Sequence, residues 1–340
     1  MSLSFEHLSL VLGQWLQPII QRLPPAFQNV LLHPLAPKAI LVFLALAILR
    51  QTNRALTNWS MNNGQSVEKW DNNREVILLT GGCGGIGKQM MLDLSKKGAR
   101  VVIIDIQEPT FSLPSGVTFY KADITSSESI AEVAGKIRAA HGDPTVLINN
   151  AGVAHDGTIL HKPEAKIRQT FEVNTISHFL LVREFLPSMV EKNHGHVVTI
   201  ASMASFLGLG DMVEYSCSKA SALAFHEGLR QELRLWYKAP KVRTTIVHPI
   251  WVRTQMIKIL TDTGSEFKQP ILTPEMVSEA VVKQVFAQRS GQIILPGYCT
   301  PLSMLRALPN WFQEFARGVG CRDFIKLREF QAKQLKEQQS

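Results

Sequence analysis

The chain has 340 residues, 45% hydrophobic and 19% charged, which suits one α/β domain of about 250 residues with extra segments. Its net charge of +8 lies mostly in the flanks, because residues 1–70 and residues 301–340 carry +3 each. A nucleic-acid-binding protein should carry a basic stripe on its folded domain, so no nucleic-acid partner is expected. Basic flanks favour an anionic membrane surface, or are ordinary surface charge.

Residues 1–70 are apolar and interrupted by prolines, which indicates a membrane anchor. Their most hydrophobic run, residues 39–49, lies between Lys38 and Arg50. Such a helical run reaches about 16 Å, short of the roughly 30 Å hydrocarbon core. The pattern therefore favours a monotopic or hairpin anchor, and leaves open a single span or a helix packed on the globular domain. No cleaved signal peptide is expected, because the run begins late and no basic segment precedes it.

Residues 71–300 alternate between strand and helix patterns. Strands are predicted at 75–80, 101–105, 117–121, 145–149, 196–201, 242–247 and 292–295, and helices at 86–97, 127–140, 164–192, 213–237 and 274–288. Continuous apolar strands joined by helices imply a parallel sheet covered on both faces. The predicted fold is an α/β, Rossmann-type doubly wound parallel sheet, between the N-terminal anchor region (1–70) and a C-terminal tail (301–340).

A glycine-rich turn follows the first of these strands and opens a helix, at residues 80–87. Backbone N–H groups and the helix dipole favour a pyrophosphate there, and Gly81, Gly85 and Gly87 permit the tight turn. Asp105 ends the second strand, where a carboxylate accepts hydrogen bonds from the adenosine ribose and repels a 2′-phosphate. The pattern predicts an NAD(P) cofactor, with NAD favoured by Asp105.

A second constellation joins Ser202 to Tyr215 and Lys219, which are four residues apart and so share a helix face. A lysine ammonium beside the phenol would favour its ionised form, so that the tyrosine could exchange protons near neutral pH. Four scattered cysteines without a Cys-x-x-Cys pair (Cys83, Cys217, Cys299 and Cys321) predict neither a metal site nor a disulfide framework.

With these motifs in order, residues 74–298 resemble the short-chain dehydrogenase/reductase family. Residues 80–87 match its TGxxxGxG loop and residues 149–152 its NNAG segment. The resemblance implies Tyr215 as general acid/base and Ser202 as a hydrogen-bond partner of the substrate oxygen. It implies that Lys219 lowers the tyrosine pKa and holds the nicotinamide ribose, and that Asn174 supports a water-linked proton path. The implied cofactor contacts are Gly81, Gly85, Ile86, Gly87, Asp105, Asp123, Asn150, Tyr215, Lys219, Val252 and Thr254.

The sequence departs from this family after the sixth strand, where Pro249-Ile250 replaces the usual Pro-Gly. Val252 and Thr254 still fit the loop that contacts the nicotinamide. The missing glycine is expected to alter how this loop approaches the ring.

A narrower resemblance, carried by residues 170–174, 185–187 and 194–202, is to membrane-associated members: microsomal retinol dehydrogenases and lipid-droplet 17-beta-hydroxysteroid dehydrogenases. It implies a lipophilic alcohol, ketone or aldehyde substrate, a lid at 251–274, and a place at the endoplasmic reticulum or lipid droplet with the catalytic domain in the cytosol. It also allows a homodimer. The alternatives are a tailoring reductase of a biosynthetic pathway and an inactive cofactor-binding protein of the membrane surface.

The tail, residues 301–340, has apolar residues at helical spacing (Leu308, Trp311, Phe312, Phe315 and Val319) with Arg306 and Arg317 nearby. This pattern is typical of an interfacial amphipathic helix. Docking on the protein's own core or on a dimer partner would produce the same pattern.

Overall fold

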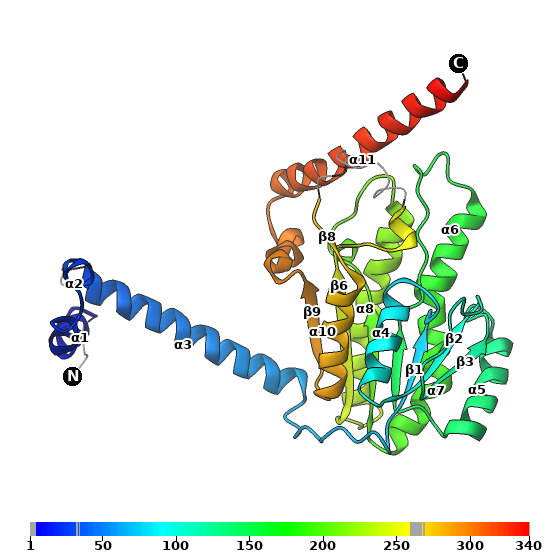
Figure 1. Ribbon diagram of the computed structural model, residues 1–340, viewed down its shortest axis with the longest axis horizontal. Helices are drawn as coiled ribbons and strands as arrows, with labels where there is room; N and C mark the ends of the chain where they lie inside the picture. The colour runs from blue at the N-terminus through cyan, green and yellow to red at the C-terminus, as the bar shows by residue number, and fades with distance from the viewer. Residues whose placement is uncertain (1–4, 32, 34, 259–266, 268, 340) are drawn as a thin grey trace. The chain divides into compact units, whose positions relative to one another are not determined.

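The computed structural model describes residues 5–31, 33, 35–258, 267 and 269–339, with two compact units, Met1–Met61 and Asn62–Ser340 (Figure 1). Residues 259–266 and 268 of the predicted lid lie outside the described residues. The division into anchor, catalytic domain and tail remains a prediction.

The first unit consists of α1 (Phe5–Ile20), α2 (Pro25–Leu31) and α3 (Ala36–Met61). α3 extends beyond the apolar run because residues 50–61 contain neither proline nor glycine to end it. Its 26 residues span about 39 Å at 1.5 Å per residue. Among the described residues it is the one helix long and apolar enough to cross a membrane, with a mean hydropathy of 1.4 over its most apolar stretch. Length and composition therefore allow the single span as well.

The second unit is built on a parallel sheet with strand order β3-β2-β1-β4-β5-β6-β9. The order reverses at β1, which pairs with β2 on one side and β4 on the other, so the predicted Rossmann-type fold is confirmed. A small second sheet pairs β7 (Trp251–Val252) with β8 (Ile271–Leu272). The bounds of the large sheet are β1 Val76–Thr80, β2 Arg100–Asp105, β3 Val117–Lys121, β4 Val146–Asn149, β5 Gly195–Ile200, β6 Val242–Pro249 and β9 Gly291–Leu295.

Helices cover both faces of this sheet because the apolar strand residues alternate between two cores. Ile77 and Leu79 point into one core, which α4 (Gly85–Lys96) and α10 (Pro274–Phe286) close. Val76 and Leu78 point into the other, against α5 (Ser127–His141), α7 (Ser177–Glu191) and α8 (Val213–Leu235). Figure 1 shows these layers.

The helix predicted at 164–192 is interrupted in the structure. α6 (Glu164–Phe171) passes into a π-helical stretch, Glu172–Ile176, and only then into α7. Such a stretch widens the helix by one residue and is often found at functional sites. Here it contains Asn174.

After β9 the chain forms a 3₁₀ stretch (Gly297–Ala307) and then α11 (Asn310–Gln339), both in the second unit. Leu308 therefore precedes the helix that was predicted to contain it. Shorter 3₁₀ turns lie at Met203–Ser205 and Gln255–Ile257. Because the strands are parallel, β1, β4, β5 and β6 all end along one border of the sheet and begin along the opposite border. The border where they end is called the carboxyl edge, and the border where they begin is called the amino edge.

Candidate active site

The glycine turn lies at the carboxyl edge, at the point where the strand order reverses. Gly81 and Gly85 have φ of +70° and +51°, values that side-chain-bearing residues rarely adopt. At Gly87 the limit is space, since a Cβ there would stand 2.0 Å from the Gly81 carbonyl oxygen. The structure therefore places all three glycines in a turn that only glycine can form.

Asn150 holds this turn in place. Its side-chain amide donates to the carbonyl oxygens of Thr80 (2.9 Å) and Gly81 (3.2 Å). Its backbone N–H donates to the Thr80 hydroxyl (3.1 Å). Asn150 thus stands beside the predicted cofactor loop, and its side chain bonds the loop itself.

The start of α4 has the features that a pyrophosphate site needs. Gly84 is the N-cap residue, and no side chain caps the helix. A Cβ added at Gly84 would meet no heavy atom within 4 Å, so open space adjoins the N-terminus of α4. Ile86 in the first turn is partly buried against the core. Uncapped N–H groups, the helix dipole and this space together fit the phosphates of NAD(P).

Asp105 lies at the end of β2, next to this turn. Its Oδ2 accepts a hydrogen bond from the Cys83 N–H (3.0 Å), and its Oδ1 one from the Gln107 N–H (3.0 Å). Burial raises the pKa of the Cys83 thiol to about 12, and the Asp105 carboxylate adds to this. Asp123 follows β3 and is exposed, with its Oδ1 accepting from the Thr125 N–H (2.9 Å) and hydroxyl (2.7 Å).

Tyr215 and Lys219 lie in the first two turns of α8, with the lysine ammonium 5.7 Å from the centre of the phenol ring. Lys219 is buried and its Nζ donates to the Ile200 carbonyl oxygen (2.9 Å) at the end of β5. Ser202 is two residues further along, and its hydroxyl accepts from the Ala204 N–H (3.1 Å) and lies near enough to Tyr215 to lower the pKa of the phenol. The structure therefore brings the three predicted side chains together at the carboxyl edge.

Asn174 joins them from the π-helical stretch. Its Oδ1 accepts from the Val153 N–H (2.8 Å), and its Nδ2 donates to the Val153 carbonyl oxygen (2.8 Å). The same amide donates to the Ser218 hydroxyl (3.1 Å) on α8. Asn174 thus ties the loop after β4 to the helix that carries Tyr215 and Lys219.

Burial shifts the pKa values of Tyr215 and Lys219 in opposite directions. Burial raises the pKa of the Tyr215 phenol, and the hydrogen bond with Ser202 lowers it in part. Burial lowers the pKa of Lys219 to about 8. The tyrosine pKa thus moves opposite to the sequence expectation, because removing the phenolate from water costs more than the surrounding groups return.

The loop after β6 reaches the glycine turn despite the missing glycine. The Ile250 N–H donates to the Leu295 carbonyl oxygen of β9 (2.9 Å), and its side chain packs on the core. Val252 is buried in β7. The Thr254 methyl carbon lies 3.1 Å from the place of a Cβ on Gly85. Val252 and Thr254 thus lie in the loop that meets the glycine turn.

A buried ion pair next to Tyr215 has no signal in the sequence. Lys162, in the loop after β4, pairs with Glu214, and both side chains are buried. The Lys162 Nζ also donates to the His155 carbonyl oxygen (2.7 Å). The two partners are 52 positions apart, and in the sequence each resembles an ordinary surface charge. Gly84 is another residue of the site that the sequence analysis did not single out. Its position in the glycine-rich run of residues 80–87 is the signal that could have identified it.

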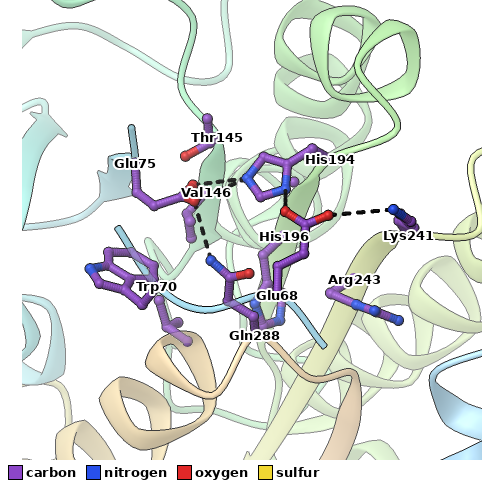
Figure 2. A pocket seen from close by; sticks show the side chains of 12 residues that line it. Glu68, Trp70, Glu75, Thr145, Val146, His194, His196, Lys241, Arg243 and Gln288 are labelled. Atoms are coloured by element: carbon purple, nitrogen blue, oxygen red, sulfur yellow. Dashed lines mark hydrogen bonds and ion pairs between the residues drawn. The ribbon is translucent and has the colours of Figure 1, made fainter. Parts of the chain in front are cut away.

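A cavity with several charged side chains in its lining lies at the amino edge, where the strands begin (Figure 2). Figure 2 shows the Glu75 carboxylate pointing to His194 (Nε2–Oε1 3.0 Å) and Gln288 (3.2 Å). Glu68 lies between His194 and Lys241. Among the residues lining this cavity there is no predicted site residue. Its network fastens residues 66–75 to the sheet.

Comparisons with known proteins agree with this geometry. The short chain dehydrogenase family model matches residues 75–264, and the chain belongs to that family. It is therefore an oxidoreductase that binds NAD(P) and acts on CH–OH groups.

Among curated relatives, the chain is 42% identical over 199 residues to dehydrogenase RED2 of Cochliobolus heterostrophus, covering 57% of this chain and 75% of the relative. It is 34% identical over 247 residues to estradiol 17-beta-dehydrogenase 11 of Macaca fascicularis, covering 70% and 80%. The resemblance to the hydroxysteroid dehydrogenase branch is thus confirmed. A 3-ketoacyl-(acyl-carrier-protein) reductase from Brucella melitensis complexed with NADH has the same fold (TM-score 0.58, 19% identity, covering 66% of this chain and 98% of that one).

Proposed function

We propose that this dehydrogenase works at a membrane or lipid-droplet surface, where it transfers hydride between a nicotinamide and a lipophilic alcohol, ketone or aldehyde. The observation that carries the catalytic part is the position of Tyr215 beside the buried Lys219, whose Nζ lies 5.7 Å from the centre of the phenol ring, with Ser202 just past the end of the neighbouring strand. Bound NAD(P) would supply or accept the hydride. Every proton movement then falls to the chain's own residues.

Tyr215 is proposed to give a proton to the substrate oxygen during reduction and to take it back during oxidation. The Ser202 hydroxyl would orient the same oxygen. Lys219, when charged, would stabilise a phenolate at Tyr215 and offer N–H donors to the ribose. Asn174 would fix the position of α8 against the loop after β4, through Ser218 and Val153. Gly81, Gly85, Gly87 and the N-terminus of α4 would hold the pyrophosphate, and Asp105 would favour NAD over NADP.

Two surfaces support the membrane part of the proposal. α3 is apolar over its first half and none of its residues is buried. In α11, Trp311 is 72% exposed, and Phe312, Phe315 and Val319 are exposed as well. Aromatic residues beside arginines are typical of helices that lie in the interface of an anionic membrane. We therefore propose α3 as the anchor and this face of α11 as a second lipid contact, on the endoplasmic reticulum or a lipid droplet.

The catalytic proposal is tested by assaying the purified full-length protein on retinoids, steroids and fatty aldehydes in phospholipid vesicles, with NAD(H) and NADP(H) in parallel. Wild-type protein should turn over at least one of these substrates, and Tyr215→Phe should reduce kcat/KM by about 10²- to 10⁴-fold. Cofactor binding should persist in the variant. An unchanged rate in Tyr215→Phe would contradict the role of Tyr215. Lack of turnover by wild-type protein with bound cofactor would support the inactive alternative.

The second lipid contact is tested by vesicle co-sedimentation of the full chain with Trp311→Ser/Phe315→Ser. Trp236→Ser is the matched control, because Trp236 is 69% exposed and follows the end of α8, at the amino edge of the sheet. The double variant should bind anionic vesicles less tightly than wild type, and the control should not. Equal binding of all three proteins would remove α11 from the proposal.

A further inference from the structure

The C-terminal helix packs on the loops of the carboxyl edge. Phe324 is 5% exposed and lies in a cluster with Leu209, Ile257 and Phe267. The Trp251 ring centre lies 5.5 Å from that of Phe324. The Cys321 thiol also accepts a hydrogen bond from the Gly210 N–H (3.3 Å). One side of α11 is therefore built into the part of the molecule that surrounds the proposed reaction.

Arg328, one turn further along α11, reaches the loop that leads into α8. Its Nε and Nη2 donate to Asp211 Oδ2, at 3.0 and 2.8 Å. The Asp211 side chain is only 10% exposed, and its Oδ1 has no hydrogen-bond partner among the described residues. Asp211 also has φ of +66°, which costs energy for a residue other than glycine. A buried carboxylate in a strained turn depends on its cation, and that cation is Arg328.

The same guanidinium also reaches the loop after β4, since its Nη1 lies 2.9 Å from Asp156 Oδ2. Asp156 follows His155, whose carbonyl oxygen accepts from the buried Lys162. Lys162 in turn pairs with Glu214, the residue before Tyr215. Two loops that adjoin Tyr215 from different strands are therefore held against one helix by a single side chain.

We propose that Arg328 is a positioning residue, which sets the binding of the substrate by holding the Asp156 and Asp211 loops at a fixed separation beside Tyr215. The inference rests on the proposed role of Tyr215. It assigns the C-terminal helix a part in substrate recognition, in addition to its proposed lipid contact. Arg328 would act through these loops, because its guanidinium binds the carboxylates of Asp211 and Asp156.

The test compares Arg328→Met and Arg328→Lys in the full-length protein, with Arg317→Met as control. Arg317 lies on the same helix, and its guanidinium binds Glu314 and Gln313 of that helix. Arg328→Met should raise KM for the lipophilic substrate by about tenfold with a smaller change in kcat. Cofactor affinity should not change. Lysine should recover part of the loss, because it keeps the charge and loses the forked geometry.

Hydrogen exchange of the same proteins gives a readout that does not depend on turnover. Exchange in residues 153–158 and 207–212 should rise several-fold in Arg328→Met, and remain at the wild-type level in Arg317→Met. Unchanged exchange in both loops, or an unchanged KM in a protein with faster exchange, would overturn the inference. If wild-type protein turns nothing over, the proposed function fails, and the exchange result still decides whether Arg328 holds the loops.

Discussion

The Asp105 carboxylate accepts a hydrogen bond from the backbone N–H of Cys83, 3.0 Å away. This bond links the residue proposed to select the cofactor to the turn proposed to bind its pyrophosphate. One oxygen bonds Cys83 and the other bonds Gln107, so the carboxylate is fixed at the end of β2. Its negative charge beside the proposed ribose position is the physical basis for the proposed preference for NAD.

Asp105→Ser should therefore shift the cofactor preference towards NADP. Removing the charge relieves the repulsion of a 2′-phosphate, so the ratio of kcat/KM for NADPH to that for NADH should rise by about tenfold or more, roughly 1.4 kcal/mol. Steady-state kinetics with both cofactors measure the ratio. Asp123→Ser, at an exposed carboxylate after β3, should leave it nearly unchanged. A ratio that moves only in the Asp123 variant would exclude Asp105 as the selecting residue.

Gly87→Ala and Gly84→Ala should differ sharply, although both add one methyl group to the same turn. At Gly87 the new carbon would stand 2.0 Å from a backbone oxygen, whereas at Gly84 no heavy atom lies within 4 Å. Gly87→Ala should lower the melting temperature and abolish cofactor binding. Gly84→Ala should keep the melting temperature of the wild type and weaken NADH binding, because the methyl group occupies the space at the start of α4. Differential scanning fluorimetry and NADH fluorescence measure the two effects, and tight NADH binding by Gly84→Ala would place the pyrophosphate elsewhere.

The stability of the apoprotein should rise with pH between about 8 and 10.5 because of Lys219. Burial lowers its pKa to about 8 from 10.5, so in this interval the unfolded chain binds a proton that the folded protein does not, and unfolding becomes less favourable as pH increases. Lys219→Met should lack this rise. It should be more stable than wild type at pH 7, by about 1–3 kcal/mol, and should lose turnover. Urea unfolding at pH 7, 8.5 and 10 provides the comparison, and parallel pH profiles for the two proteins would contradict it.

The amino edge should lose stability in acid through Glu75. Burial raises the pKa of this carboxyl, but hydrogen bonds from His194, Thr145 and Arg74 outweigh it and lower the pKa to about 2. The carboxylate therefore stabilises the fold fully above about pH 4.5. That stabilisation disappears as pH falls towards 2. Glu75→Gln should be less stable than wild type at pH 7, by at most about 3 kcal/mol.

The difference between Glu75→Gln and wild type should shrink between pH 4.5 and 2 in thermal unfolding experiments. Glu132→Gln, at an exposed carboxylate paired with Lys136 on α5, is the control and should change stability little at any pH. A Glu75 difference that does not depend on pH would point to lost packing as its cause.

Most of the fold could be predicted because its signals are local. Each strand of the large sheet is a short apolar run between turn residues, and the glycine turn and the Tyr-Lys spacing are contiguous motifs. The interruption at Glu172–Ile176 could not be predicted, since the helical pattern of residues 164–192 continues through it. What fixes it is the pairing of Asn174 with Val153 and Ser218.

Contacts between distant segments set the other features that the sequence did not reveal. In the sequence these charged residues look like ordinary solvent-exposed side chains. Only the folded loops bring them together as the pairs Lys162–Glu214, Arg328–Asp156 and Arg328–Asp211. The direction of the Tyr215 pKa shift also depends on contacts between distant segments. The spacing along the helix predicts the neighbouring lysine, but it does not predict the burial that raises the pKa.

The π-helical stretch has a consequence for insertions and deletions in this chain. A residue in an α-helix turns by about 100° relative to the one before it. Deleting one residue between Glu172 and Asn174 would let α6 and α7 join as one regular helix, yet it would rotate either Asn174 or the whole of α6 away from its present neighbours. The deletion would remove the extra residue of the π-helical stretch and make the helix regular, and the hydrogen bonds of Asn174 with Val153 would be lost. Length variation at this point would therefore disrupt the geometry of the site, a constraint that a scan of single substitutions along the same helix would not detect.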